Sequence, residues 1–194
     1  MARRSESDTE HVSHTFREFM EMFTLLLDEA NRSYAHVTLL NDQFARRAFV
    51  RATFAYIEGV TYGLKQVALL ASEGTFKPGE LALLKEESYE ISEAGKLKIR
   101  AARLSTLANI RLAFSALSRS QGTDYRLPVH DQPWSTLKEA LQVRHRITHP
   151  KSTVSLLVSD AEVQSVYSAG EWFMDCVKSA FAAAVTKDAP EPTV

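Results

Sequence analysis

The feature that most constrains this chain is a run of thirty residues, from Gln43 to Ser72, that contains no proline. Small and apolar residues recur along one side of the run at helical spacing, and Asp42 in front of it is a good helix N-cap. The run therefore predicts one long helix. Because aromatic residues also occur on its other sides, we expect this helix to be central in the fold. Gly59 and Gly63 would let a neighbouring helix approach closely.

The rest of the sequence also has helical periodicity, and no segment is rich in strand patterns. Proline, glycine and aspartate mark a loop over residues 121–131, and residues 153–158 are expected to form a short extended or irregular connector. Further helices are predicted over residues 12–35, 78–89, from about 97 or 102 to 120, 132–149 and 159–185. These elements predict an all-α fold, a single-domain bundle of about five to seven helices. We expect a flexible leader at residues 1–10, one helical domain at 11–187 and a flexible tail at 188–194.

Composition excludes some classes of function. The chain has 194 residues, 45% of them hydrophobic, and a formal net charge of −1. A balanced charge argues against a non-specific nucleic-acid coat, so any phosphate binding must come from a local patch. The single cysteine, Cys176, cannot form an internal disulfide, which fits a reducing compartment. Since no apolar run is long enough to cross a bilayer and the start lacks a secretion signal, we expect a cytoplasmic protein without membrane contact.

The sequence has none of the usual catalytic signatures. It contains no Gly-x-Ser-x-Gly elbow, no phosphate loop, no dinucleotide fingerprint, and no cysteine and histidine cluster at zinc-binding spacing. We therefore expect neither a metal nor a cofactor, and any chemistry would come from the side chains alone.

Charged residues fall on nearly one line of the long helix, since seven residues make close to two helical turns: Arg47, Arg51, Glu58 and Lys65. One interpretation is a solvated helix face with local ion pairs. Another follows from the apolar surroundings of this helix, which would leave Glu58 partly buried and in need of an arginine partner. Arg144 and Arg51 are the candidates for that partner.

The most unusual stretch is residues 143–150, VRHRITHP, which holds two arginines and two histidines within six residues and then a proline. Proline has no backbone N–H and disfavours helical geometry in the residue before it, so the helix should end at His149. One interpretation is an ordinary helix end, where the macrodipole favours cations by about 0.3 to 1 kcal/mol each. The other is a site that handles phosphate.

Residues 144–149, RHRITH, resemble the R-x(4-6)-H motif of the HEPN family. In that family the motif lies near the end of a late helix in a small helical bundle, and asparagine, aspartate or histidine often follows the arginine. The proline after the motif, the long early helix RRAFVRATFAYIEGVTYGLK and the late position of the motif are also similar. The likeness is sharp over the motif and loose over the rest of the chain.

The resemblance implies a metal-independent endoribonuclease that acts as a homodimer, with the motifs of both protomers in one composite site. Carried over to this sequence, Arg144 and His149 would form the catalytic pair. Arginine suits phosphate binding, and histidine titrates near neutral pH. The supporting residues would be His145, Arg146, Glu58 and Arg51. Active members of the family are often toxins or phage-defence effectors, so an antitoxin or another partner protein is also implied.

Two functional hypotheses follow. The first is this ribonuclease, and since no extended basic surface for a long RNA is evident, its substrate would be a structured or short RNA. The second is a non-catalytic helical module that binds a nucleotide or a partner protein, as many members of the family do. Catalysis needs Arg144 and His149 to converge with their copies in one cleft, whereas the module lets them face bulk solvent or lie buried.

Overall fold

The computed structural model describes residues 6–72 and 74–187. In chain order its elements are α1 (Glu6–Leu40), α2 (Gln43–Ala68), α3 (Pro78–Leu84), β1 (Glu87–Ile91), β2 (Leu97–Ala101), α4 (Thr106–Gln121), α5 (Gln132–Thr148), the 3-10 helix η1 (Val154–Leu156) and α6 (Asp160–Lys187). The predicted single helical domain is confirmed, but the fold also contains a two-stranded hairpin and so is not purely helical. None of the described helices combines the length and the apolar character that a membrane span requires.

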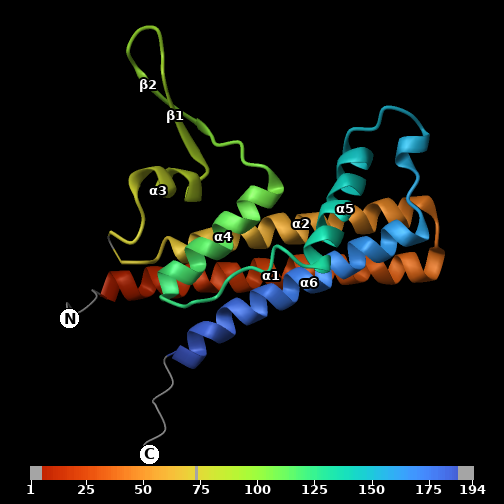
Figure 1. The fold of residues 1–194 in the computed structure, drawn as a ribbon, viewed down its shortest axis with the longest axis horizontal. Helices are drawn as coiled ribbons and strands as arrows, with labels where there is room; N and C mark the ends of the chain where they lie inside the picture. Colours follow the sequence, from red (N-terminus) through yellow and green to blue (C-terminus); the bar gives the residue numbers. More distant parts are fainter. Residues whose placement is uncertain (1–5, 73, 188–194) are drawn as a thin grey trace, which may run out of the picture.

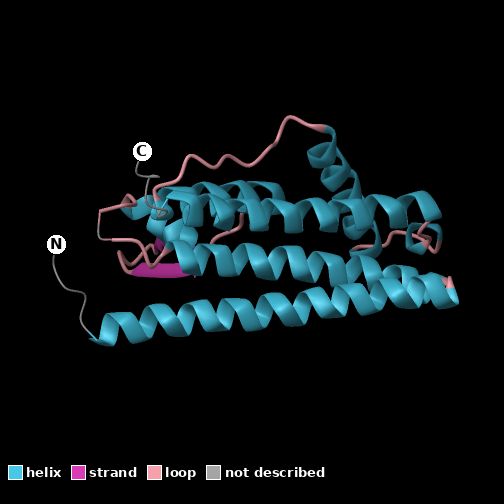
Figure 2. Cartoon of the chain, turned by 90° about the horizontal axis from the view of Figure 1, so that it is seen from below, coloured by secondary structure: helices cyan, strands magenta, loops and turns pink. Residues whose placement is uncertain are grey.

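α1 and α2 form a closely packed antiparallel pair joined by a tight turn (Figure 2). Asn41 has a left-handed backbone with φ of 48°, and the Asp42 side chain accepts the Ala45 N–H at 2.7 Å, which confirms the predicted N-cap. A Cβ on Gly63 would lie 2.5 Å from the Phe19 ring of α1. This position therefore needs glycine because the neighbouring helix lies against its backbone.

The core surrounds α2, which packs against α1, α4, α5 and α6 (Figure 1). Tyr56 of α2 and Phe114 of α4 both meet Phe173 of α6 edge to face, with ring centroids 5.7 and 5.8 Å apart. All three rings are almost fully buried. α2 is thus the central helix that its apolar circumference predicts.

The hairpin is the largest departure from the predicted fold. β1 pairs antiparallel with β2, with Tyr89 opposite Ile99, where the sequence favoured helices on both sides of a turn. Gly95 makes the turn with a left-handed φ of 71°. Apolar residues at every second position on both strands, such as Ile91 and Leu97, have the period of two that marks a strand, but the segments are short and the signal is weak. Figure 1 shows the hairpin standing away from the helical bundle.

Several predicted boundaries also need correction. α1 begins at Glu6, so residues 6–10 are helical rather than a loose leader, and it continues to Leu40. α2 ends at Ala68, before the expected Ser72, and α6 continues to Lys187. Residues 1–5 and the predicted tail at 188–194 lie outside the described residues. Helix ends fray and local propensity is weak there, so boundaries are the least predictable part of a helix.

Candidate functional site at the C-terminal end of α5

α5 has both of the ends that its sequence predicts. At its start, the Asp131 carboxylate accepts the Trp134 N–H at 3.2 Å. At its other end, the His149 N–H donates to the carbonyl of His145 at 3.0 Å, and Pro150 follows outside the helix. The motif therefore occupies the last turns of a helix whose inner face is buried in the core.

Four of the predicted site residues line one open hollow beside this helix end. The lining consists of Gln142, Arg144, His145, Arg146, His149, Lys151 and Ser155. None of these lining residues is acidic, and the set combines three cations with two imidazoles. Such a wall favours an anion. The other two predicted residues, Glu58 and Arg51, belong to α2 and do not line the hollow.

Glu58 holds Arg144 in place across the interface between α2 and α5. Arg144 Nη2 lies 3.0 Å from Oε1 and 3.2 Å from Oε2 of Glu58. The two side chains are 27% and 40% exposed, so the guanidinium remains partly open to solvent. Of the two candidate partners for Glu58, the structure selects Arg144. Arg51 is exposed, and its side chain has no hydrogen bond or ion pair within residues 6–72 and 74–187.

The imidazole rings of the two histidines in the motif do not help to hold the fold together. His145 and His149 are exposed, and neither imidazole has a hydrogen bond or an ion pair in the described part of the chain. Being four residues apart, they lie about one helical turn from each other on the same side of α5. Both rings are therefore open to a ligand in the hollow.

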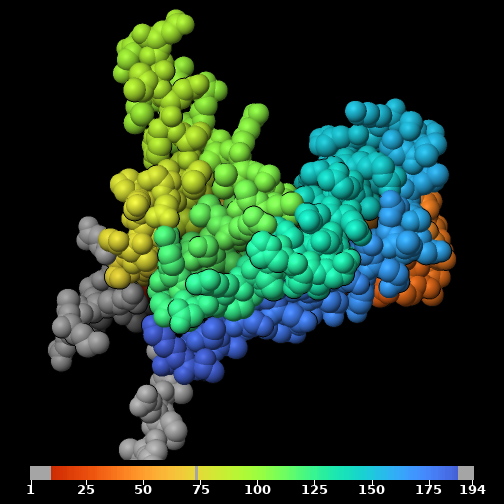
Figure 3. All heavy atoms as spheres, viewed as in Figure 1, coloured from red at the N-terminus to blue at the C-terminus, as the bar shows by residue number. Residues whose placement is uncertain are grey.

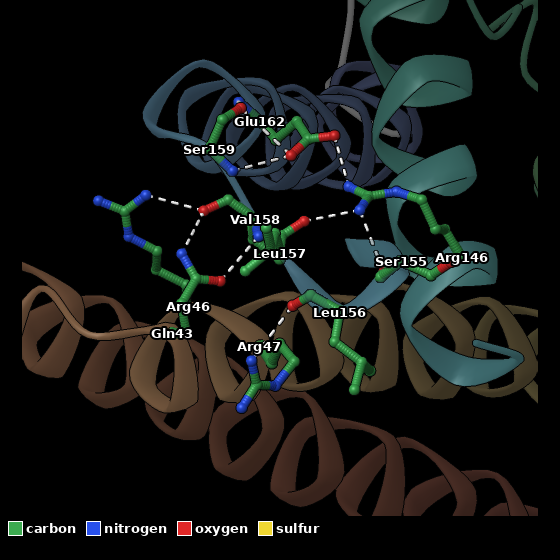
Figure 4. Close-up of polar contacts among 10 residues, drawn as sticks. All are labelled: Gln43, Arg46, Arg47, Arg146, Ser155, Leu156, Leu157, Val158, Ser159 and Glu162. Carbon is green, nitrogen blue, oxygen red and sulfur yellow. Dashed lines mark hydrogen bonds and ion pairs between the residues drawn. The ribbon is translucent and has the colours of Figure 1, made fainter. Parts of the chain in front are cut away.

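Arg146 differs from these residues because its guanidinium binds other parts of the protein. Nη1 donates to the carbonyls of Leu157 at 2.6 Å and Ser155 at 3.1 Å, and Nη2 lies 2.6 Å from Glu162 Oε1. Figure 4 shows Arg146 reaching from α5 to the connector and to the first turn of α6. Glu162 also forms a capping box with Ser159, a pattern of serine and glutamate three residues apart that is typical of a helix start. Arg146 thus fixes the wall of the hollow rather than offering a free charge to it.

α2 binds the same connector from the other side (Figure 4). Gln43 and Val158 exchange two hydrogen bonds, of 3.0 Å from Nε2 to the carbonyl and of 2.8 Å from the N–H to Oε1. Arg46 donates to the same carbonyl at 2.8 Å, and Arg47 donates to the carbonyl of Leu156 at 3.1 Å. These contacts satisfy backbone carbonyls that no regular element pairs. The connector clamp is the set Gln43, Arg46, Arg47, Arg146 and Glu162.

Sequence reasoning missed three lining residues of the hollow, Gln142, Lys151 and Ser155. Lys151 follows the motif and its proline directly, so its position in the sequence could have predicted that it lies beside the motif. Ser155 reaches the hollow only because the connector folds back against α5, and no local pattern predicts that path.

Lys65 corrects the interpretation of the charged line on α2 as a solvated face. Its side chain is fully buried, and Nζ lies 2.6 Å from Glu86 Oε1 and 2.8 Å from Asn109 Oδ1. Glu86 directly precedes β1 and Asn109 belongs to α4. The lysine therefore ties the base of the hairpin to two helices, a role that depends on contacts far apart in the sequence.

Residues 6–72 and 74–187 contain no group of three or more His, Cys, Asp or Glu side chains that could hold a metal ion. No protein-family model matches the chain, and no curated protein and no solved structure matches it either.

Proposed function

We propose that this protein is a metal-independent endoribonuclease of the HEPN type that acts as a homodimer. The observation that carries the proposal is the hollow at the end of α5, where the held guanidinium of Arg144 and the free imidazole of His149 share a wall without carboxylates. Such a wall attracts a phosphodiester and supplies the proton transfer and the positive charge that its cleavage needs. The spacing of the two residues in the sequence, which resembles the family motif, supports the same activity.

Cleavage needs one base, one acid and no further reactant. The ribose 2′-oxygen attacks the adjacent phosphorus and loses its proton to a histidine, while the P–O5′ bond breaks and the 5′-oxygen gains a proton. The products are a 2′,3′-cyclic phosphate and a 5′-hydroxyl. His149 accepts the proton of the 2′-oxygen, and Arg144 neutralises the charge that develops on the non-bridging oxygens. Glu58 positions Arg144 for this contact.

A second copy of the chain completes the site. The attacking and leaving oxygens lie on opposite sides of the phosphorus, so the base and the acid must approach from two directions. One protomer supplies His149 from one helix end only, with His145 beside it on the same side. A twofold axis next to α5 would bring the partner's imidazole to the other side and would double the positive charge.

A second candidate function is a non-catalytic module that binds a nucleotide or a partner protein, such as an antitoxin, in the same hollow. The observation that favours it is the ion pair between Arg144 and Glu58, which reduces the net charge that Arg144 offers to a phosphate. Both candidates bind an anion at the end of α5, but only the first cleaves RNA. A toxin or phage-defence role belongs to the first.

Cleavage of RNA by the purified full-length protein in EDTA tests the proposal. We expect the wild type to degrade a structured RNA, and we expect His149→Ala to lose this activity while its helical circular-dichroism spectrum stays unchanged. Expression of the wild type should also be toxic to a host cell beside a harmless Arg144→Ala control. A wild type that binds RNA and leaves it intact would instead support the binding module.

A further inference from the structure

The net charge of −1 averages segments of very different charge. α1 carries seven acidic residues and two arginines. By contrast, the thirty residues from 94 to 123 contain no acidic residue and six cations, Lys96, Lys98, Arg100, Arg103, Arg111 and Arg119. This basic segment runs through β2 and all of α4. Positive charge is therefore concentrated in this segment, which the net charge alone does not reveal.

An open groove lies along α4, between this helix and the loop that leads to α5. Arg111, Ser115 and Arg119 follow one another at intervals of four residues and so share one exposed face of α4. Arg126 faces them from the loop. Asp124 is the one acidic side chain among the described lining residues. The groove thus presents three arginines against one carboxylate.

Aromatic rings hold two of these arginines in position. The Arg111 guanidinium lies 5.0 Å from the centroid of the Trp134 ring, and that of Arg119 lies 4.9 Å from the Phe76 ring. A guanidinium stacked on a ring keeps its N–H edge available for phosphate oxygens. Arg119 also pairs with Glu80 at 2.9 Å, whereas Arg111 and Arg126 have no carboxylate partner in the described residues. Arg111 and Arg126 are therefore the two cations most available to a ligand.

We propose that this α4 groove binds the phosphate backbone of the RNA strand that enters the hollow at the other end of α5. The choice of RNA rests on the proposed function; the groove itself is defined by its arginines. Figure 3 shows α4, the loop over residues 122–131 and α5 on one face of the molecule, and a strand bound along these elements would lead from the groove toward the end of α5.

The length of α5 sets the distance that the strand must cover. Arg111 stacks on Trp134 in the first turn of α5, and His149 ends the same helix, which has 17 residues. At 1.5 Å per residue the 15 residues from Trp134 to His149 place the two regions roughly 22 Å apart, or roughly six to seven nucleotides of stacked strand at about 3.4 Å each. A substrate of about four nucleotides cannot occupy both. The groove therefore affects long RNA and leaves short RNA unaffected.

A binding titration tests the groove independently of cleavage. We would titrate the full-length protein against a fluorescent 2′-O-methyl RNA of about 20 nucleotides, in which the blocked 2′-oxygen prevents turnover. Removing two phosphate contacts with the double variant R111Q/R126Q should weaken binding about tenfold or more in 0.1 M salt. It should also reduce the slope of log K against log salt by about 1.4, which is the value for two contacts on a single strand.

The control variant removes the same charge elsewhere. Arg17 and Arg32 are exposed on the acidic α1, so R17Q/R32Q should leave both the affinity and the slope unchanged. Arg126→Gln alone changes an exposed loop residue without an aromatic partner, and it should give about half of the slope change if the double variant folds poorly. In the cleavage assay, R111Q/R126Q should raise KM for the long RNA and leave the rate on a four-nucleotide substrate unaltered.

The outcomes separate the groove from the nuclease. Equal affinity and slope for the wild type and R111Q/R126Q, or an equal loss in R17Q/R32Q, would overturn the groove, as would a wild type that does not bind the probe. A wild type that binds through Arg111 and Arg126 but cuts nothing in EDTA would retain the groove and refute the nuclease.

Discussion

Arg144 and Arg146 lie two residues apart on α5 and face different surroundings. Arg146 belongs to the connector clamp, where it makes three polar contacts with the connector and α6. Arg144 belongs to the open hollow, where its one partner is Glu58 and the imidazoles beside it are free in the described residues. Two residues turn a helix by about 200°, so the two side chains leave α5 in different directions and reach different partners, although both line the hollow.

The contrast teaches that a basic motif is not one chemical unit. What an arginine does depends on which acceptors reach it first. The connector presents carbonyls that no regular element pairs, and the cations near them donate to these carbonyls. Leaving a buried carbonyl such as that of Val158 without a partner costs about 1 to 3 kcal/mol, so these cations are committed to the fold. The His149 ring has no hydrogen bond or ion pair in the described part of the chain, which leaves it to a ligand. Each of the following substitutions tests one side of this division.

The largest effect should come from removing the charge of Arg144, which lies in the open hollow. We expect Arg144→Ala to lower kcat/KM for RNA by about 100- to 1000-fold, because a phosphate oxygen loses its charged donor in the transition state. Stability should change little, since the Glu58 carboxylate that remains is 40% exposed and can be solvated. Initial cleavage rates and a thermal melt measure the two effects. A variant that melts far below the wild type would show that Arg144 belongs with the clamp.

The second substitution removes the charge of Arg146, which belongs to the connector clamp. Arg146→Met keeps the apolar part of the side chain and should destabilise the protein. We expect a loss of about 2 to 3 kcal/mol in the free energy of unfolding, because carbonyls of the connector and the Glu162 carboxylate lose a charged donor. Urea denaturation followed by circular dichroism gives this value. At a temperature where the variant is fully folded, its cleavage rate should stay within about threefold of the wild type. If the Arg146→Met variant were stable but inactive, Arg146 would contribute to RNA cleavage and not to the stability of the fold.

Glu58→Gln tests the link between the two helices with a smaller effect. The amide keeps the shape of the carboxylate but loses its charge, so Arg144 is held less firmly. We expect a cost of about 1 kcal/mol in transition-state binding, or about fivefold in kcat/KM. Titrating the cleavage rate with salt gives a second measurement, since screening should reduce the difference between the two proteins. A faster enzyme would mean that Glu58 competes with the substrate for Arg144.

Arg51→Gln should have the smallest effect of the series. Its side chain is exposed and lies outside the hollow, so both the unfolding free energy and the cleavage rate should stay within about 0.5 kcal/mol of the wild type. The variant is also the matched control for Glu58→Gln, because both residues belong to the charged line of α2. A larger change in rate would place Arg51 in the path of the RNA.

Much of this arrangement is encoded locally. The Asp42 cap, the end of α5 before Pro150 and the capping box of Ser159 and Glu162 each depend on residues a few positions apart, and all three are present. The choice of partner for Glu58 was narrowed to two arginines by the same kind of argument. Such local predictions are reliable when a backbone N–H group and the side chain that accepts its hydrogen bond lie within one turn of the chain.

The rest depends on contacts between segments far apart in the sequence. Lys65 is buried because Glu86 and Asn109 reach it from other elements, and nothing near Lys65 distinguishes it from a solvated lysine. Arg146 is committed to the fold because the connector turns back toward α5 after Pro150. The hairpin was missed because two strands of five residues carry little periodic signal.

Subunit mixing tests most directly whether Arg144 and His149 work beside their own copies. The wild type would be mixed with an equal amount of the double variant R144A/H149A, with exchange of subunits followed by energy transfer between labelled copies. If both protomers build each site, the exchanged mixture should cleave RNA at about a quarter of the rate of the same total amount of wild type, because only about a quarter of the dimers contain two intact copies. A rate of about half after complete exchange would show that each protomer acts alone, which would contradict the composite site.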